Sequence, residues 1–173
     1  MQKNTASKNP RRSGKPHTRR QAAAMLAAIE RGKTMDEAAD RLDDLKPADR
    51  SLAKAMVMLA LRHRGEITAL LAQHLKRAIP PRPHLAKALL HIGVVQICLM
   101  EIPDHAAVSE TVNACGRQEK PYRGLINAIL RKLVGQEAPE ALLPDNPSLN
   151  MPDWMMAQWA EHYGADKAEQ IAV

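Results

Sequence analysis

The chain has 173 residues, 45% of them hydrophobic, with no Phe, two Trp and two Tyr. Its length suits one ordinary domain with extensions, and its apolar residues, mostly Ala, Leu, Met and Val, favour helices over strands. The uncharged apolar run at residues 88–100 is shorter than the roughly 20 residues that a membrane-spanning helix needs, so we expect no membrane segment.

The net charge of +6 comes from the N-terminus. Residues 1–20 contain seven Lys and Arg and no acid, whereas the other 18 bases are matched by 19 acids. Residues 1–17 predict a disordered basic arm, which suits a polyanion because phosphate contacts release counterions. A solubilising tail is the alternative, and charge alone does not separate the two. The candidates for RNA binding in this region are Arg11, Arg12, Lys15, Arg19 and Arg20.

The two cysteines, Cys98 and Cys115, show neither a C-x-x-C spacing nor the pattern of a disulfide framework. Both fall in apolar helical patterns, so we expect buried, reduced thiols and a cytoplasmic protein. The polar N-terminus lacks the apolar segment of a signal peptide.

Seven helices are predicted between residues 18 and 134, and no useful stretch alternates as a strand would, so the expected fold class is all-α. Thr34 and Glu37 predict a capping box at the start of the second helix. Prolines at 80, 81 and 83 interrupt the chain before the fifth helix. The expected helices cover residues 18–32, 34–45, 47–64, 66–75, 84–102, 104–115 and 121–133.

The fifth helix, residues 84–102, is expected to be the centre of the fold. It is apolar or small almost all round, apart from a narrow polar sector with Lys87, His91 and Glu101 and from Gln96 on the opposite side. Such a helix is normally packed by neighbours on most sides. Gln96 is then a buried amide, for which a structural hydrogen bond is favoured over a ligand role.

Residues 135–151 have the proline and acid content of a linker. Residues 152–173 predict the first helices of a following module, in which Trp154 and Trp159 need a surface to pack against. The helical pattern has no stop signal at Val173, so we expect the natural chain to continue.

Patterns typical of catalysis and metal binding are missing from the sequence. The seven histidines and two cysteines show no metal-ligand spacing, and neither a Gly-x-Gly phosphate loop nor a Gly-x-Ser-x-Gly elbow occurs. We therefore expect no catalytic residue, no bound metal and no cofactor in this chain.

The seventh helix carries the most informative surface. Arg123, Asn127 and Arg131 are spaced four residues apart, which predicts a polar ridge opposite the apolar stripe. Residues 117–132 hold five Lys and Arg against one acid, Glu119. We favour a phosphate-binding patch over an ordinary solvated face or an Arg131 that bonds a buried carboxylate. The candidates are Arg117, Lys120, Arg123, Asn127, Arg131 and Lys132, and Arg62 and Arg64 extend the patch if they lie nearby.

Several segments together resemble the NusB-like helical domain. They include LRHRG (61–65), LLHIGVVQI (89–97), IPDHAAVSETV (102–112) and GLINAILR (124–131). The resemblance covers residues 18–134 and implies a bundle of about seven helices. Stand-alone NusB antitermination factors usually end in a phenylalanine-containing motif, whereas LINAILR followed by a linker and PDWMMAQWAEHYG (152–164) is similar to the RsmB (Sun/Fmu) family of rRNA methyltransferases.

That resemblance implies an enzyme that methylates C5 of cytosine in small-subunit ribosomal RNA with S-adenosylmethionine, and a NusB-like domain that helps to bind RNA. The family's cysteines stand in Pro-Cys and Thr-Cys-Ser contexts, which neither Cys98 nor Cys115 shows. We therefore expect an RNA-binding domain that is inactive without its catalytic part. The expected partners are ribosomal RNA and the catalytic domain. The alternative is an antitermination adaptor, a regulator of transcription that binds boxA-like RNA and a ribosomal protein.

Overall fold

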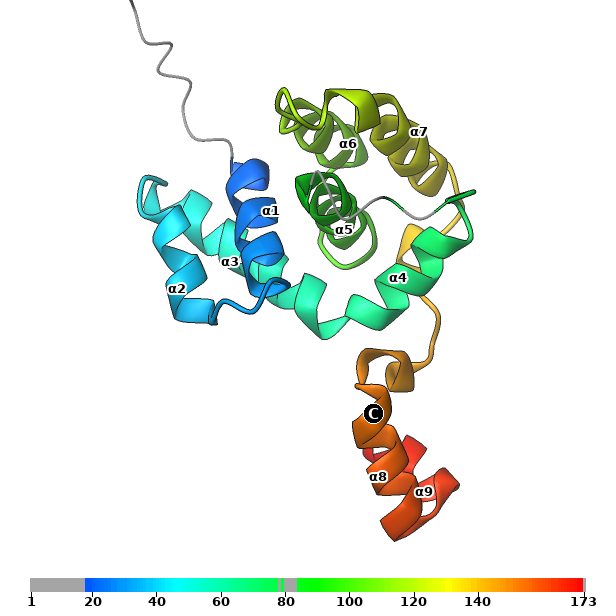
Figure 1. Cartoon of the computed structure of the whole chain (residues 1–173). Coiled ribbons are helices and arrows are strands. Elements are labelled where there is room, and N and C mark those ends of the chain that lie inside the picture. Colours follow the sequence, from blue (N-terminus) through cyan, green and yellow to red (C-terminus); the bar gives the residue numbers. More distant parts are fainter. Residues whose placement is uncertain (1–17, 78, 80–83, 173) are drawn as a thin grey trace, which may run out of the picture.

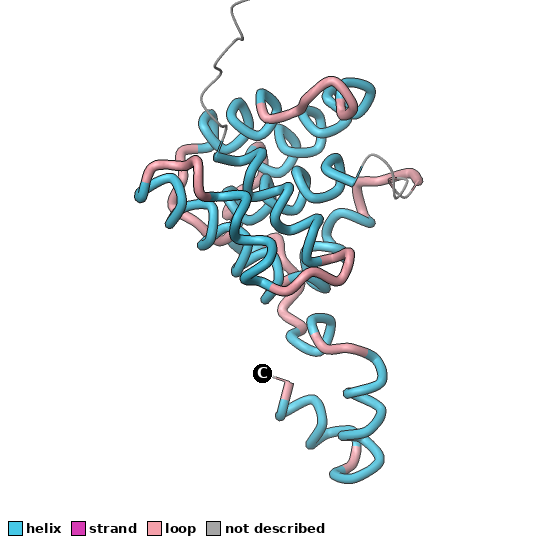
Figure 2. The backbone as a smooth tube through the Cα atoms, turned by 60° about the vertical axis from the view of Figure 1, so that its left-hand side comes forward, coloured by secondary structure: helices cyan, strands magenta, loops and turns pink. Residues whose placement is uncertain are grey.

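The computed structural model describes residues 18–77, 79 and 84–172, and the predicted basic arm lies outside them. Every regular element in this part of the chain is a helix, as the tube in Figure 2 shows. The predicted all-α class is therefore confirmed. In the same residues, no helix combines the length and apolar character that crossing a bilayer requires.

Seven of the α-helices form a bundle and two form a C-terminal hairpin (Figure 1). Short 3-10 turns connect several of them. The bundle contains α1 (Thr18–Ile29), α2 (Met35–Ala39), α3 (Pro47–Arg62), α4 (Arg64–Ala72), α5 (His84–Cys98), α6 (Asp104–Asn113) and α7 (Arg123–Val134). The hairpin contains α8 (Asp153–Tyr163) and α9 (Ala165–Ile171), and the 3-10 turns are η1 (Asp40–Leu42), η2 (Lys120–Tyr122), η3 (Pro139–Ala141) and η4 (Pro147–Asn150).

Helix α5 lies at the centre of the bundle and contacts α1, α3, α6 and α7 (Figure 1). Every residue from Ala88 to Cys98 is buried. Gly93 allows α7 to approach closely, because a Cβ at this position would lie 2.6 Å from Leu130 Cδ2. The prediction of a central fifth helix is confirmed.

Gln96 is fully buried and hydrogen-bonded, as predicted. Its amide nitrogen donates to the Ile92 carbonyl at 3.0 Å and to Thr111 Oγ1 at 2.9 Å, and its amide oxygen accepts from Arg19 Nε at 2.9 Å. These bonds join α5 to α6 and α1. Since an unpaired buried amide costs about 1–3 kcal/mol, this arrangement favours one packing of the three helices.

His91 is buried although its sector of α5 was expected to be polar; it is 1% exposed. Neither ring nitrogen has a hydrogen-bond partner among the residues that the structure describes. Burial lowers the pKa of His91 to about 3, with a smaller contribution from the nearby cations Lys87 and Arg64. The ring is therefore neutral at physiological pH.

Several helices are shorter than predicted. The capping box of Thr34 and Glu37 is present, but α2 ends at Ala39 and tightens into the 3-10 turn η1. Helix α5 ends at Cys98 rather than near 102, and Ile102 N donates to the Met100 carbonyl in a turn that precedes Pro103. The residue before a proline avoids helical backbone, so Pro103 keeps the helix from including Ile102.

Residues 135–151, the expected linker, lie against the bundle. Leu142 and Leu143 are partly buried against the core, and η3 contacts α5. Beyond them, α8 and α9 pack on each other and project from the bundle (Figures 1 and 2). Trp154 is 66% exposed, whereas Trp159 is half-buried.

Candidate nucleic-acid interface

Residues 117–132, which lead into α7 and form most of it, expose charged side chains of one sign, all of them cationic. Their single acid, Glu119, is 0% exposed and points inward. Glu119 Oε2 accepts hydrogen bonds from Arg20 Nη1 and from the Gly116 backbone N–H, both at 2.8 Å. The exposed charged residues of this segment, which we call the basic surface, are Arg117, Lys120, Arg123, Arg131 and Lys132.

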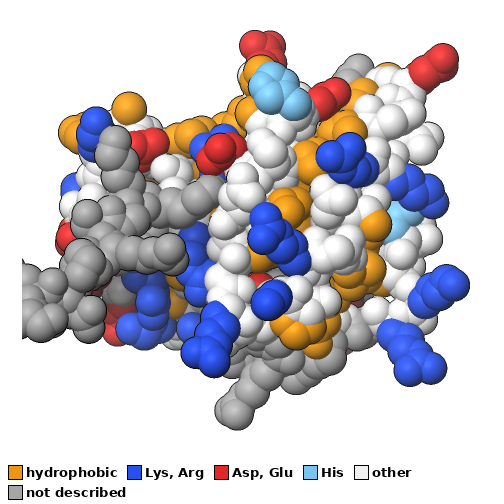
Figure 3. Space-filling model, turned by 90° about the horizontal axis from the view of Figure 1, so that it is seen from above, with side chains coloured by type: hydrophobic (Ala, Val, Ile, Leu, Met, Phe, Trp, Pro, Cys, Tyr) orange, Lys and Arg blue, Asp and Glu red, His pale blue; other side chains and the backbone are white. Residues whose placement is uncertain are grey.

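Inward placement of Glu119 strengthens the field of the basic surface. An exposed carboxylate among five cations would neutralise part of their potential, whereas this one is already paired with Arg20. Figure 3, which looks down on the end of the molecule with α6 and α7, shows Lys and Arg side chains separated by hydrophobic ones. The sequence count is five bases to one acid, but the one acid is buried, so all the exposed charges are positive. This surface therefore attracts a polyanion more strongly than the count implies.

Arg19 and Arg20 have partners within the bundle. Arg19 bonds Gln96, and Arg20 Nη1 donates to the Ala114 carbonyl at 3.0 Å in addition to Glu119. A Cβ at Gly116 would lie 2.6 Å from Arg20 Nη1, so glycine leaves room for the guanidinium. Both arginines therefore hold helices together. The other arm candidates, Arg11, Arg12 and Lys15, lie outside the described residues.

The predicted ridge on α7 is present and is tied to α6. Arg131 Nε donates to Asn127 Oδ1 at 3.1 Å, four residues earlier on the same helix. Arg123 Nη2 donates to Asn113 Oδ1, also at 3.1 Å. The alternative expectation, that Arg131 bonds a buried carboxylate, does not match the structure. Arg131 is exposed, and its hydrogen bond goes to the amide of Asn127.

A groove of about 490 Å³ runs between α6 and α7. Apolar side chains line one part of it and polar side chains the rest. Its lining residues are Asp104, His105, Val108, Ser109, Val112, Asn113, Asn127, Arg131 and Val134. The ridge of α7 is thus one wall of a concave site.

Arg64 does not extend this interface. Its Nε lies 3.7 Å from Glu30 Oε1, just after the end of α1, and Lys87 Nζ lies 3.6 Å from the same oxygen. Arg20, near the start of α1, is the residue that contacts the segment leading into α7. Arg20 and Glu30 are ten residues apart, which is about 15 Å along a helix. Arg64 therefore lies beside the opposite end of α1 from the one that contacts the segment leading into α7. Arg62 is exposed and is the last residue of α3, next to the same junction.

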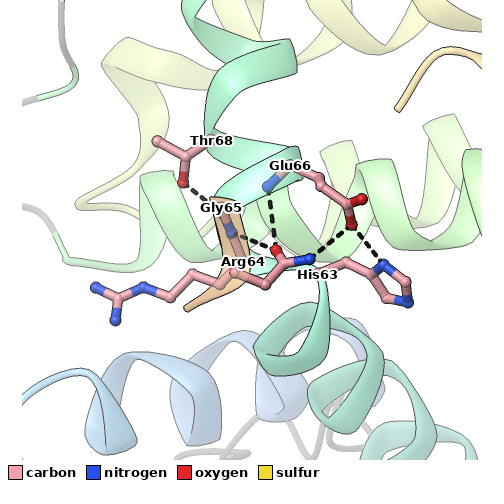
Figure 4. A network of polar contacts seen from close by, with 6 residues as sticks. His63, Arg64, Gly65, Glu66 and Thr68 are labelled. Atoms are coloured by element: carbon pink, nitrogen blue, oxygen red, sulfur yellow. Dashed lines mark hydrogen bonds and ion pairs between the residues drawn. The ribbon is translucent and has the colours of Figure 1, made fainter. Parts of the chain in front are cut away.

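A second polar site, which the sequence analysis missed, joins the α3–α4 junction to the end of η4 (Figure 4). Asn150 Oδ1 accepts from the backbone N–H groups of Gly65 and Glu66 at 2.9 and 3.2 Å. Asn150 Nδ2 donates to Glu66 Oε2 at 2.9 Å, and the same oxygen lies 2.7 Å from His63 Nδ1. Asn150 therefore caps α4 in place of His63, whose side chain makes no capping bond.

Gly65 is required for this contact, because a Cβ there would overlap the Leu149 carbonyl. The partners are 84 and 85 residues apart, a separation at which no local sequence signal exists. The glycine within LRHRG was the only local clue to a close backbone approach.

The cysteines lack the setting of a nucleophile. Cys98 is buried and Cys115 is half-buried. Burial raises the pKa of the Cys115 thiol, and the nearby carboxylate of Glu119 raises it further. Reactive cysteines show the opposite shift, so this direction does not favour Cys115 as a nucleophile. Across the described ranges, no three His, Cys, Asp or Glu side chains gather as metal ligands would.

The helical bundle corresponds to a known class of protein. The chain belongs to the NusB family, whose sequence model matches residues 16–135. This range ends one residue after α7 and contains the groove, the basic surface and the α3–α4 junction. The family that the sequence motifs indicated is thereby confirmed.

Curated relatives of this chain are rRNA methyltransferases. The "Ribosomal RNA small subunit methyltransferase B" of Xanthomonas campestris is 36% identical over 156 residues, which cover 88% of this chain and 35% of the relative. The proteins of the same name from Thermus thermophilus and Pseudomonas syringae are 34% and 32% identical, over 88% and 83% of this chain and 37% and 34% of their own length. The chain thus spans about a third of these relatives.

The similarity to these relatives is not confined to the NusB domain. Residues 1–135 make up less of the chain than the 88% that two of the matches cover. The matched region therefore reaches into the segment that carries η4 and leads to the hairpin. Asn150 lies near the end of this segment.

Proposed function

We propose that the NusB-family domain of this chain binds small-subunit ribosomal RNA through the basic surface, as part of a protein that methylates that RNA. The observation that carries the proposal is the inward placement of Glu119, which leaves five exposed cations, one of which, Arg131, lines the groove. Phosphate contacts supply most of the affinity of such surfaces. Arg19 and Arg20 have a structural role in this proposal, and Arg11, Arg12 and Lys15 add RNA contacts from the arm.

The names of the relatives support methyl transfer to ribosomal RNA as the activity of the whole protein. S-adenosylmethionine is the proposed methyl donor and the cytoplasm the proposed location. The antitermination alternative is less favoured, because the similarity to the methyltransferases extends beyond the NusB domain. The proposed role of this chain is to hold RNA, and the methyl-transfer step belongs to residues outside it.

The proposal is tested by measuring the affinity for fragments of small-subunit rRNA by fluorescence anisotropy at 50 to 200 mM salt. Affinity should fall steeply with salt, since each phosphate contact contributes roughly 0.7–0.9 to the slope of log K against log salt. Replacing Arg123, Arg131 and Lys132 by Ala should lower the slope by about 2.

A matched control replaces three exposed cations of the α2–α3 region, Arg41, Lys46 and Lys54, by Ala. It changes the net charge equally but leaves the basic surface intact. An equal loss of affinity in both triple variants would show that only net charge matters. Absence of binding at low salt would refute the proposed function itself.

A further inference from the structure

The groove between α6 and α7 has the size and lining of a site for a small planar group. Its volume of about 490 Å³ lies within the roughly 300–1,000 Å³ typical of ligand pockets. Val108, Val112 and Val134 supply apolar contacts, while Asn127 and Arg131 place hydrogen-bonding groups along the other wall. An apolar surface beside amide and guanidinium groups suits a nucleobase, which has a flat apolar face and a polar edge.

The orientation of the amides gives the groove a hydrogen-bonding preference. Asn127 faces the Arg131 guanidinium and Asn113 faces that of Arg123, each through Oδ1 at 3.1 Å. A guanidinium can only donate, so the amide atom beside it must be oxygen. The NH2 group of each asparagine consequently faces away from its arginine. The polar wall therefore presents donors, and its best ligand carries acceptors on its edge.

The two walls also differ in charge. The α7 wall contains Arg131 and adjoins Lys132, whereas Asp104 stands at the start of α6. A phosphate is attracted to Arg131 and Lys132 and repelled by Asp104. A bound nucleotide is thus oriented with its phosphate over α7 and its base toward α6, where Asp104 can accept a ring N–H.

We propose that this groove receives one unpaired base that carries a carbonyl next to a ring N–H, uracil or guanine, and discriminates against cytosine and adenine, which lack this pair. The carbonyl oxygens accept from the asparagine and arginine donors, and the ring N–H faces the Asp104 carboxylate. In cytosine and adenine an amino group stands where uracil and guanine carry this carbonyl, at C4 and C6, and it would meet the donors of the α7 wall. This inference rests on the proposed RNA-binding function and specifies the single-stranded part of the ligand.

The test compares labelled hexauridylate and hexacytidylate, which have the same length, charge and ring size. Wild-type protein should bind the uridine oligomer about five-fold more tightly, the equivalent of one hydrogen bond of about 1 kcal/mol. Asn127→Asp keeps the side-chain shape but replaces the NH2 donor by an acceptor. The added negative charge should weaken binding of both oligomers. The affinity for hexauridylate divided by that for hexacytidylate should fall to one or below.

Gln158→Glu on α8 is the control, because it makes the same change of amide to carboxylate at an exposed position far along the chain. It should retain the five-fold ratio. Asn127→Ala removes the donor without adding charge and should also bring the ratio toward one, which guards against misfolding of the Asp variant.

Equal binding of the two oligomers by the wild-type protein would overturn the groove inference, and so would a preference that survives both Asn127 variants. In either case, salt-dependent binding of rRNA fragments would leave the proposed function standing. Loss of all RNA binding at low salt would remove both.

Discussion

The Asn150 cap on α4 predicts that one side chain beyond the NusB domain stabilises a helix inside it. Asn150→Ala removes the acceptor for the Gly65 and Glu66 N–H groups and the donor to Glu66 Oε2. Loss of an asparagine cap costs about 0.5–2 kcal/mol. The buried Glu66 carboxylate, 7% exposed, also loses its bond from Asn150 Nδ2 but keeps His63 as a partner. This loss adds about 1 kcal/mol to the cost. We expect a total loss of about 1.5–3 kcal/mol.

Two measurements check this value. Urea unfolding gives the change in the free energy of unfolding, and amide hydrogen exchange by NMR reports the protection of Gly65 and Glu66 individually. Asn146→Ala is the matched control, because Asn146 lies in the same segment, is exposed and makes no side-chain capping bond. It should change neither quantity by more than about 0.5 kcal/mol.

Asn150→Asp separates the two parts of the interaction. It keeps an acceptor for the backbone N–H groups but places a like charge beside the Glu66 carboxylate. Protection of the Gly65 and Glu66 amides should therefore stay closer to wild type in Asn150→Asp than in Asn150→Ala. If the Gly65 and Glu66 amides exchange in Asn150→Ala as slowly as in the wild type, Asn150 does not cap α4.

Three further outcomes follow from buried polar groups. Gln96→Ala should cost about 3 kcal/mol in urea unfolding, since three hydrogen bonds across three helices are lost. Gln96→Glu should also destabilise, because it keeps the acceptor for Arg19 Nε but places a buried carboxylate oxygen against the Ile92 carbonyl. His91→Leu should flatten the pH dependence of stability: with a native pKa near 3 and an ordinary value of 6.5, the unfolded state alone binds a proton between these limits, so wild-type stability falls by up to about 1.4 kcal/mol per pH unit on acidification. An unchanged slope in the variant would contradict this. Arg20→Ala should destabilise by about 3–5 kcal/mol because it removes the cation that pairs with the buried Glu119 carboxylate and leaves the Gly116 N–H as the remaining donor to it, and adding Glu119→Gln should restore much of the loss in thermal or urea unfolding.

Local patterns predicted the helices, because the information for a helix lies within a few turns. The apolar run around Gly93 could only be satisfied at the centre of a bundle, and the lone amide of Gln96 within it had to be hydrogen-bonded. The capping box at Thr34 and Glu37 was likewise a signal that spans four residues. These predictions are confirmed.

Contacts between distant segments could not be predicted in the same way. Glu119 was counted as a surface acid within a basic segment, although its partner Arg20 is 99 residues away. Arg20 was counted as part of a basic arm for the same reason. Charge counts along a chain treat every ionisable side chain as exposed, and the error is largest where two such groups pair across the core.

The Asn150 cap also has a consequence for the order in which the chain folds during synthesis. The start of α4 leaves the ribosome 85 residues before its capping amide. At synthesis rates of about 5–20 residues per second, this delay lasts roughly 4 to 17 s. During that interval the nascent α4 must leave its first N–H groups to water, and its final conformation awaits the arrival of a segment made after the seventh helix.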